Sequence, residues 1–554
     1  MRLDFKQRGA LAGLGLRLLC AVACGGESAR GGTVVIATAQ DPDGLFPPTH
    51  EGEVALQVSE LLFDHLAERG PAMNTLGDSG FEPRLARRWQ WARDSLSLTF
   101  ELDPRARWHD GQRVRASDVR FAWSVYTDPL VASRVGGDLS QSLDSVSVRD
   151  SLTCVAWFKA RTPEQFNTLV MSLTPLPEHV LGRTPRDSLR TSAFVRAPVG
   201  NGPFRFVRWD ARQRVEIAAN TDYYRGRPRL DRVIWSITPE MRTIVQGLVA
   251  GEADFVERLT PVDAAAAALR PDIRVVQRGN FDYAFVRFNF FDGPSDRPHP
   301  LFADRALRRA ISMSLDRGAM VHNVLDTLGH TGLGPFLRLH WSADTTIAPL
   351  PFDTTTAGRT LDSLGWRRGA DGMRARGTRA LAFGMLVPTS SNNRQKFAVL
   401  IQEQLRQAGI KMTLEPVDQN TLGDRQRSRR FDAAFDALVP TPSPSGLRQT
   451  WTSTGTKPGG LNHGRYVNPA FDAMVDSAVG AADTRVAKER YRAAYRIAID
   501  DAPAVWMFEP VQVAGVNKRL QVGALRRDGW WRGIPDWFIA PAARLPRDTA
   551  ASTR

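Results

Sequence analysis

Cysteine is scarce in this chain, which has three among its 554 residues. If the N-terminal leader is removed and Cys24 is acylated, Cys154 has no partner for a disulfide. A disulfide framework is therefore excluded, and a hydrophobic core must stabilise the fold. Long apolar runs are also missing beyond the leader, so we predict no membrane-spanning helix.

Signatures of catalysis are missing as well. The sequence contains no G-x-S-x-G elbow, no G-x-x-x-x-G-K-[ST] phosphate loop and no H-E-x-x-H zinc helix. Its nine histidines are dispersed, and Pro458 follows Lys457 where the K-T-G motif of β-lactamases needs Thr. We therefore predict no catalytic residue, no metal ligand and no enzymatic activity.

Lysine is rare too, and the basic character of the chain comes from arginine. Lys and Arg together number 73 against 59 acidic residues, which gives a formal charge of +14. The arginines are scattered among acidic residues and form no basic stripe, so we predict no nucleic-acid partner. The length exceeds the roughly 250 to 300 residues that one hydrophobic core supports, and this predicts two or more lobes.

The N-terminus has the pattern of an export signal. Arg2, Lys6 and Arg8 precede an apolar run over residues 9–23. The small residues before Cys24 resemble a bacterial lipobox, in which the cysteine is diacylated and becomes the new N-terminus. This predicts a lipoprotein held at a membrane surface, with a plain signal peptide as the alternative.

Residues 85–126 stack several local signals in one order. Alternating apolar residues from Leu96 to Leu102 predict a strand, and Asp110-Gly111 is a tight-turn pair. Apolar residues at helical spacing follow from Val119 to Tyr126, with Ser117 and Asp118 placed to satisfy free amide groups at the helix start. The block therefore predicts a strand, a turn and a helix.

This block also resembles a known family. Its residues are similar to the signature of the family 5 extracytoplasmic solute-binding proteins, the peptide and nickel type of ABC importer receptor, at Ala86, Trp89, Asp94, Phe100, Leu102, Asp110, Gly111, Ala116, Asp118 and Val119. Further matches occur at residues 198–228 and 466–472, and the resemblance covers most of the chain between Thr33 and Val513. We expect the signature to be a structural motif, because none of its positions has a chemical reason to touch a ligand.

A β-α-β succession is predicted in the second half of the chain. Alternating apolar residues at 381–385 and 410–414 indicate two strands, and residues 397–405 form the apolar face of a helix that Gly409 can end. The pattern continues through residues 431–439 and predicts a parallel sheet whose strand ends face a crevice.

The resemblance implies an α/β, two-lobed periplasmic-binding-protein-like fold, class II and cluster C type, with an extra subdomain in the first lobe. The expected division is a signal peptide with lipobox at 1–24, a tether at 25–32, lobe I at 33–278 plus 506–543 with its subdomain at about 53–197, lobe II at 279–505 and a flexible tail at 544–554.

The implied function is capture of a small solute between two hinged lobes, in a monomer that needs no cofactor. The closed form would deliver an oligopeptide or similar solute to an ABC permease, while separate ATPase subunits hydrolyse ATP. Two alternatives stay open: a surface sensor that presents a bound solute to a signalling partner, and a hydrolase on this scaffold.

Candidate ligand-binding residues lie in three places. Peptide-binding members commonly carry an Asp after the strand corresponding to 431–439, and Ser443 stands there in this chain, with Thr441 beside it and Asp432 or Asp436 as an alternative carboxylate. Because a hydroxyl cannot neutralise an ammonium, Ser443 favours a solute without a free ammonium. The remaining candidates are the first loop and two aromatic residues: Gln40, Asp41, Asp43, Phe46, Trp341 and Trp451.

Overall fold

The computed structural model describes residues 30–549 apart from 134, 280 and 458. The predicted signal peptide and the lipidation at Cys24 therefore lie outside the described residues. Within the described part of the chain, no helix has the length and apolar character needed to cross a membrane.

A mixed sheet of twelve strands runs through the whole molecule, in the order β19-β18-β20-β13-β21-β11-β1-β10-β9-β8, with β12 and β14 also pairing with β21. In the first lobe β1 (Thr33–Thr38) is central, and it pairs in parallel with β10 (Arg232–Ile237) and β11 (Phe255–Val256). The other elements of this lobe are β8 (Phe204–Asp210), β9 (Arg214–Ala219), β12 (Ile273–Gly279), α1 (Glu53–Leu62), α6 (Met241–Val249) and α7 (Pro261–Ala268).

A smaller sheet of four strands forms the subdomain of the first lobe, and its hydrophobic core is continuous with that of the main sheet. The predicted strand, turn and helix are β5 (Ser97–Leu102), the Asp110-Gly111 turn and α2 (Ala116–Tyr126), although Leu96 lies before the strand and is exposed. Its further elements are β2 (Ala67–Arg69), β3 (Phe81–Pro83), β4 (Ala86–Trp91), β6 (Leu143–Val148), β7 (Thr153–Phe158), α3 (Gly136–Ser142), α4 (Gln165–Ser172) and α5 (Glu178–Leu181).

Asp118 explains why the signature block is structural. Its carboxylate accepts hydrogen bonds from the Arg115 and Glu178 backbone N–H groups and from Trp108 Nε1, at 2.8 to 3.0 Å. One buried side chain therefore joins the start of α2, the turn and the start of α5.

The second lobe contains the predicted β-α-β unit. β18 (Ala382–Pro388) pairs in parallel with β19 (Lys411–Val417) and β20 (Ala433–Leu438), and Gly409 ends α11 (Asn392–Gln407) with a φ of +83°. The parallel sheet predicted for these three strands is therefore confirmed, and the structure adds β13 (Tyr283–Phe288), which is antiparallel to both of its neighbours. The remaining elements are β14 (Gly329–Thr331), β15 (Arg367–Arg368), β16 (Arg374–Arg376), β17 (Arg379–Ala380), α8 (Arg305–Met313), α9 (Arg317–Leu325), α10 (Thr354–Ser363), α12 (Gln419–Arg427), α13 (Leu447–Trp451), α14 (Pro469–Val479) and α15 (Thr484–Asp501).

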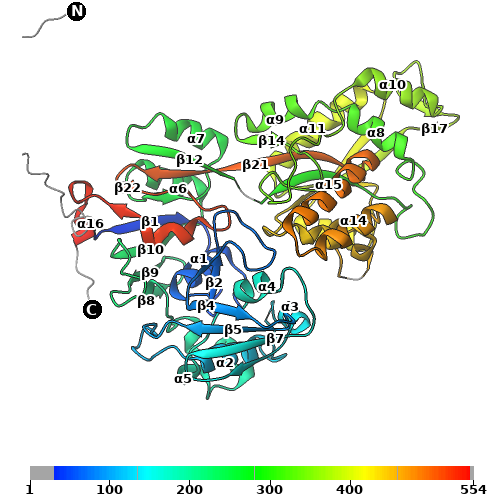
Figure 1. Cartoon of the computed structure of the whole chain (residues 1–554). Helices are drawn as coiled ribbons and strands as arrows, with labels where there is room; N and C mark the ends of the chain where they lie inside the picture. Colours follow the sequence, from blue (N-terminus) through cyan, green and yellow to red (C-terminus); the bar gives the residue numbers. More distant parts are fainter. Residues whose placement is uncertain (1–29, 134, 280, 458, 550–554) are drawn as a thin grey trace, which may run out of the picture.

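One long strand, β21 (Ala504–Asn517), belongs to both lobes (Figure 1). Residues 504–508 pair with β13 in the second lobe, and residues 511–517 pair with β12 in the first. The first crossing therefore lies between β12, which ends at Gly279, and β13, which begins at Tyr283, and the second lies within β21, where pairing with β14 ends at Pro510 and pairing with β12 begins at Val511. The boundary expected between 505 and 506 falls too early, because Trp506 and Phe508 pack in second-lobe cores.

Both ends of the described chain are fixed by a cluster that we call the terminal clasp, formed by Asp254, Arg519, Arg547 and Asp548. Arg519 pairs with Asp254 at 2.6 Å and with Asp548 at 2.7 Å, and Asp548 also accepts the Thr33 backbone N–H.

The terminal segments differ from the sequence-based expectation. A flexible tail is wrong for residues 544–549, which include α16 (Pro546–Thr549) and the clasp residues. The tether ends earlier than expected, because two of its backbone N–H groups are hydrogen-bonded just before β10. Gly31 donates to the Arg229 carbonyl and Gly32 to the Asp231 carboxylate. A final two-stranded ribbon comprises β22 (Leu520–Gln521) and β23 (Phe538–Ile539).

Candidate ligand site

A pocket of about 240 Å³ opens at the carboxyl end of β20 in the second lobe. Three predicted site residues line it, namely Thr441, Ser443 and Trp451, together with Tyr283 and His340. The pocket thus lies where the edge of the parallel strand group was expected to gather a ligand.

Local hydrogen bonds shape this pocket. Ser443 Oγ accepts the Ser445 backbone N–H and caps the short turn of residues 444–446. His340 Nε2 lies 3.2 Å from the Thr441 carbonyl oxygen, and burial lowers the pKa of His340 to about 4, so the ring is neutral near pH 7. Trp451 is 1% exposed and donates its Nε1–H to the Tyr283 hydroxyl. Its ring therefore belongs mainly to the hydrophobic core behind the pocket wall.

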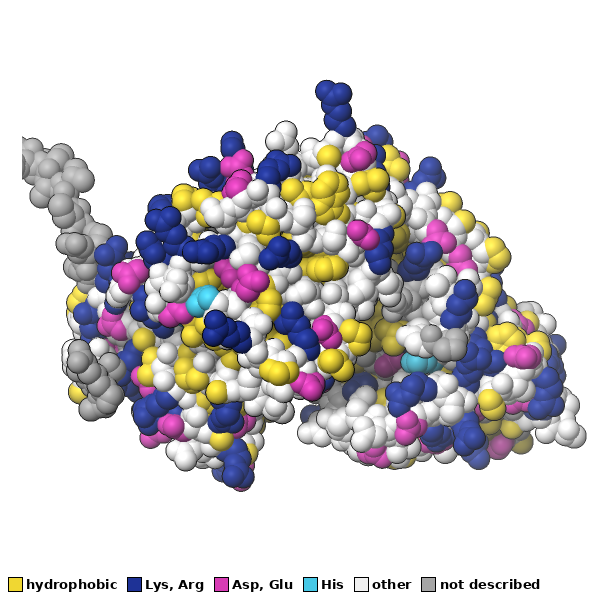
Figure 2. All heavy atoms as spheres, turned by 90° about the horizontal axis from the view of Figure 1, so that it is seen from below, with side chains coloured by type: hydrophobic (Ala, Val, Ile, Leu, Met, Phe, Trp, Pro, Cys, Tyr) yellow, Lys and Arg dark blue, Asp and Glu magenta, His cyan; other side chains and the backbone are white. Residues whose placement is uncertain are grey.

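The two lobes meet at a hydrogen-bonded contact that we call the interlobe seam, formed by Thr75, Glu164, Trp341, Ser443 and Ser445. Glu164, which precedes α4 in the first lobe, accepts hydrogen bonds from the hydroxyls of Thr75 at 2.6 Å, Ser443 at 2.5 Å and Ser445 at 2.8 Å. Trp341 Nε1 donates to Thr75 Oγ1 across the same boundary at 3.1 Å. On the face turned toward the viewer in Figure 2, the surface is notched between the two halves of the molecule.

The seam changes the interpretation of Ser443. Although Ser443 itself carries no charge, a carboxylate from the other lobe contacts its hydroxyl. Sequence reasoning missed Glu164, which lies 279 residues from Ser443 and has no motif around it.

The first-loop candidates have other partners. Asp41 accepts Trp209 Nε1 and the Arg212 backbone N–H, and Asp43 accepts the backbone N–H groups that precede α1. Phe46 is 1% exposed and packs edge-to-face with Phe194 at 5.9 Å, so its assignment as a cleft wall is wrong. Gln40 is exposed, and its backbone N–H donates to Thr38 Oγ1.

Asp436 is also committed to the protein. Its Oδ2 accepts hydrogen bonds from Arg287 at 3.1 Å and from Gln426 at 3.0 Å, and all three side chains are buried. The Arg287 guanidinium lies 4.9 Å from the centre of the Trp451 ring. Asp436 therefore fixes the wall behind the pocket, and its negative charge is compensated.

A second charged group that sequence reasoning missed lies on the first lobe. Burial and the neighbouring Glu257 raise the pKa of Glu53 to about 7, while Arg258 pairs with Glu53 at 2.9 Å. Asp282, on the crossing segment, acts electrostatically on Arg258 of the first lobe and on Arg394 of the second. Charged groups of both lobes thus meet at the crossing.

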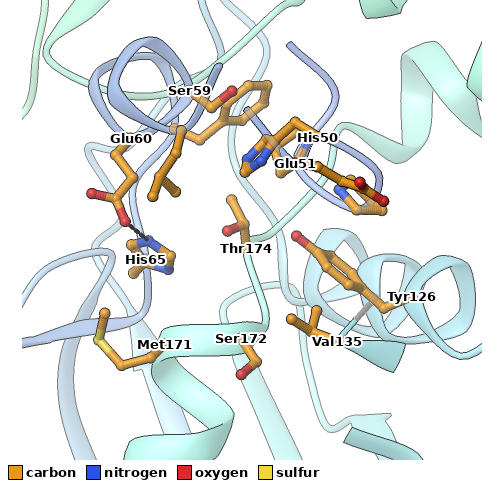
Figure 3. A pocket seen from close by; sticks show the side chains of 14 residues that line it. His50, Glu51, Ser59, Glu60, His65, Tyr126, Val135, Met171, Ser172 and Thr174 are labelled. Atoms are coloured by element: carbon orange, nitrogen blue, oxygen red, sulfur yellow. Dashed lines mark ion pairs between the residues drawn. The ribbon is translucent and has the colours of Figure 1, made fainter. Parts of the chain in front are cut away.

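Another pocket, of about 180 Å³, lies inside the first lobe between α1 and the subdomain (Figure 3). Its wall includes His50, His65, Tyr126 and Thr174, and all its lining residues come from the first lobe. Burial disfavours ionisation of Glu60 on this wall, but Arg532, His65 and Trp531 together outweigh burial and lower the pKa of Glu60 to about 2. Because the second lobe contributes nothing, lobe closure cannot close this pocket. No group of three metal-ligating side chains occurs among the described residues, at this pocket or elsewhere.

Two lobes threaded by one strand, with a pocket and a seam at their boundary, define a hinged binding protein. Comparison with known proteins narrows this class. Residues 80–459 match the profile of the bacterial extracellular solute-binding proteins, family 5 Middle, and the chain belongs to that family. It is therefore an extracytoplasmic solute-binding protein.

Individual relatives agree with this assignment. The chain is 25% identical to the oligopeptide-binding protein AppA of Bacillus subtilis over 524 residues, which cover 93% of each chain. The AppA structure with a nonapeptide superposes with a TM-score of 0.72 at 23% identity, covering 93% of this chain and 100% of that one. CtaP from Listeria monocytogenes gives a TM-score of 0.79 at 19% identity, covering 92% and 100% of the two chains. These two structures show that the fold is shared.

Proposed function

We propose that the chain is the substrate-binding component of an ABC importer and captures an oligopeptide or a solute of similar size between its lobes. A membrane permease would take the solute from the closed form, and ATPase subunits would drive transport. Support comes from the family and from AppA, whose structure holds a nonapeptide.

The observation that carries this proposal is the way in which the lobes are joined. Two crossings connect them, one between β12 and β13 and one within β21 at Pro510 and Val511, and hydroxyl groups of one lobe reach a carboxylate of the other. Rotation at a few backbone torsions would break the seam without disturbing either core. A solute that contacts both lobes favours the closed form by its differential affinity for that form.

We further propose that the protein acts as a monomer outside the cytoplasm, anchored through Cys24, and that it releases its solute unchanged. The family assignment supports the extracytoplasmic location, and the lipobox pattern supports the anchor. Metabolic labelling with a radioactive fatty acid tests the anchor, because Cys24→Ser would abolish the label.

The proposed function is tested by native mass spectrometry of the protein lacking residues 1–24, followed by release and identification of any retained solute. The identified solute at a hundredfold excess over its dissociation constant should add about 2.7 kcal/mol to the free energy of unfolding. It should also decrease the radius of gyration in solution scattering. A radius that stays constant with bound solute would contradict capture by closure.

A further inference from the structure

The seam has fewer hydrogen atoms than its contacts require. Four oxygen-to-oxygen contacts hold it: Glu164 with each of the three hydroxyls, and Ser443 Oγ with Ser445 Oγ at 2.6 Å. Each hydroxyl carries one hydrogen, and an ionised carboxylate carries none. Three hydrogens therefore serve four contacts, and one close pair of oxygens has none between its members.

The negative charge of the seam is also without a cation. Glu164 is partly buried, and its carboxylate accepts hydrogen bonds from three hydroxyl groups. Within the described part of the chain, no Lys, Arg or His side chain is ion-paired with it. The clasp carboxylates, in contrast, are paired with arginine.

Two further features of the surroundings suit a cation. Trp341 and Tyr491 pack edge-to-face at 5.9 Å, and the Trp341 indole is hydrogen-bonded to Thr75 in the seam. Aromatic faces attract ammonium and guanidinium groups. Ser443 is shared between the seam and the 240 Å³ pocket, so a solute in the pocket has direct access to the seam.

We propose that Glu164 is a specificity-determining residue that recognises an ammonium group of the solute. An ammonium has three N–H donors, no acceptor and a positive charge. It therefore supplies both the hydrogen and the charge that the seam lacks. Since Glu164 belongs to the first lobe and the pocket to the second, the same ammonium would bridge the lobes. This inference rests on solute capture by closure and names the chemical class of the solute.

The Glu164→Gln variant tests the hydrogen count without any solute. A carboxamide supplies N–H donors, so its nitrogen can donate to Ser445 Oγ and free the Ser445 hydrogen for Ser443. All four contacts then hold one hydrogen each. We expect solute-free Glu164→Gln to melt at or above the wild-type temperature, and Glu164→Ala to melt below it. An equal decrease in both variants would overturn the hydrogen deficit.

Small cations test recognition independently of peptides. Thermal shift of the full-length protein in detergent compares ethylammonium with tetramethylammonium at matched ionic strength, because the second cation has no N–H donor. We expect ethylammonium alone to stabilise the wild type, and neither cation to stabilise Glu164→Gln. Equal shifts with both cations, or an ethylammonium shift that persists in Glu164→Gln, would overturn the proposal.

Tetrapeptide pools complete the test. We expect the wild type to retain a random pool with free amino termini at least 10-fold better than the same pool after N-acetylation, and Glu164→Gln to lose that preference. If the wild type retains neither pool, capture of such peptides fails, while the small-cation experiment still decides the role of Glu164. If the wild type retains both pools equally, Glu164 does not select the ammonium.

Discussion

The terminal clasp and the interlobe seam both hold carboxylates that join distant parts of the chain, but their partners differ. In the clasp, Asp254 and Asp548 are fully buried and share the Arg519 guanidinium. In the seam, Glu164 meets neutral hydroxyls. A buried carboxylate with arginine makes a permanent contact, because separation would leave a buried charge uncompensated. A carboxylate with hydroxyls can be separated at lower cost, which suits a boundary that opens.

The largest expected effect is in the clasp. Arg519→Met leaves Asp548 buried without its arginine and should lower the free energy of unfolding by about 3 to 5 kcal/mol. Urea denaturation measures this loss, with the exposed neighbour Lys518→Met as the matched control. Solute affinity should be unchanged at a temperature where both proteins are folded. A loss below about 1 kcal/mol would show that the clasp contributes little to the fold.

The environment of the Glu509 carboxylate, at the β21 crossing, is intermediate between those of the clasp and seam carboxylates. Burial raises its pKa to about 7, although Arg338 lies 3.5 Å away and its backbone N–H donates to the carboxylate. The folded state therefore binds the proton more tightly than the unfolded state, whose pKa is near 4.5. The stabilisation from this proton is complete below pH 4.5 and is lost as the pH rises to 7.

This pKa difference predicts that the wild type and a Glu509 variant differ in how their stability depends on pH. From pH 5 to pH 8 the wild type should lose up to about 3 kcal/mol through Glu509, whereas Glu509→Gln should lack this contribution. Urea denaturation of both proteins at the two pH values gives the comparison, and Glu489→Gln on the exposed surface of α15 is the control. Parallel pH profiles of the wild type and Glu509→Gln would show that the crossing carboxylate is not protonated in the folded state.

Elements with local periodicity could be predicted from the sequence. The strand at 97–102, α2 and the α11 helix ended by Gly409 each depend on neighbours within one turn or one hairpin. The direction of β13 could not be predicted in this way, because its partners β20 and β21 lie about 150 and 220 residues later. Long-range pairing of this kind leaves no local period.

The site divides in the same way. Thr441, Ser443 and Trp451 could be found because they follow one strand, and the end of that strand faces the pocket. Glu164 could not, since it lies 279 residues from Ser443 in the other lobe and only the tertiary fold brings the two together. The first-loop residues Phe46 and Asp41 show a limit of the local pattern, because a loop residue that packs or caps has the same pattern as one that binds.

A smaller effect is expected from Trp341, because the variant Trp341→Phe keeps an aromatic ring and removes one interlobe hydrogen bond. The loss should be about 1 kcal/mol, or roughly fivefold in solute affinity, since closure forms this bond. Isothermal titration measures the affinity. Trp91→Phe removes an indole hydrogen bond to Asp78 inside the subdomain and is the matched control, with unchanged affinity expected. Equal losses of affinity in both variants would show that the effect of Trp341→Phe does not come from the seam.

The smallest effect is expected from Asp41, which sequence reasoning placed at the ligand. Asp41→Asn keeps one of the two oxygen acceptors, so one of the Trp209 and Arg212 N–H groups loses its partner on this half-buried loop, and the free energy of unfolding should fall by about 0.5 kcal/mol. Solute affinity should stay within twofold of the wild type, because both carboxylate oxygens already serve the protein. A tenfold loss of affinity with unchanged stability would place Asp41 in the ligand site and move that site from the seam toward the first loop.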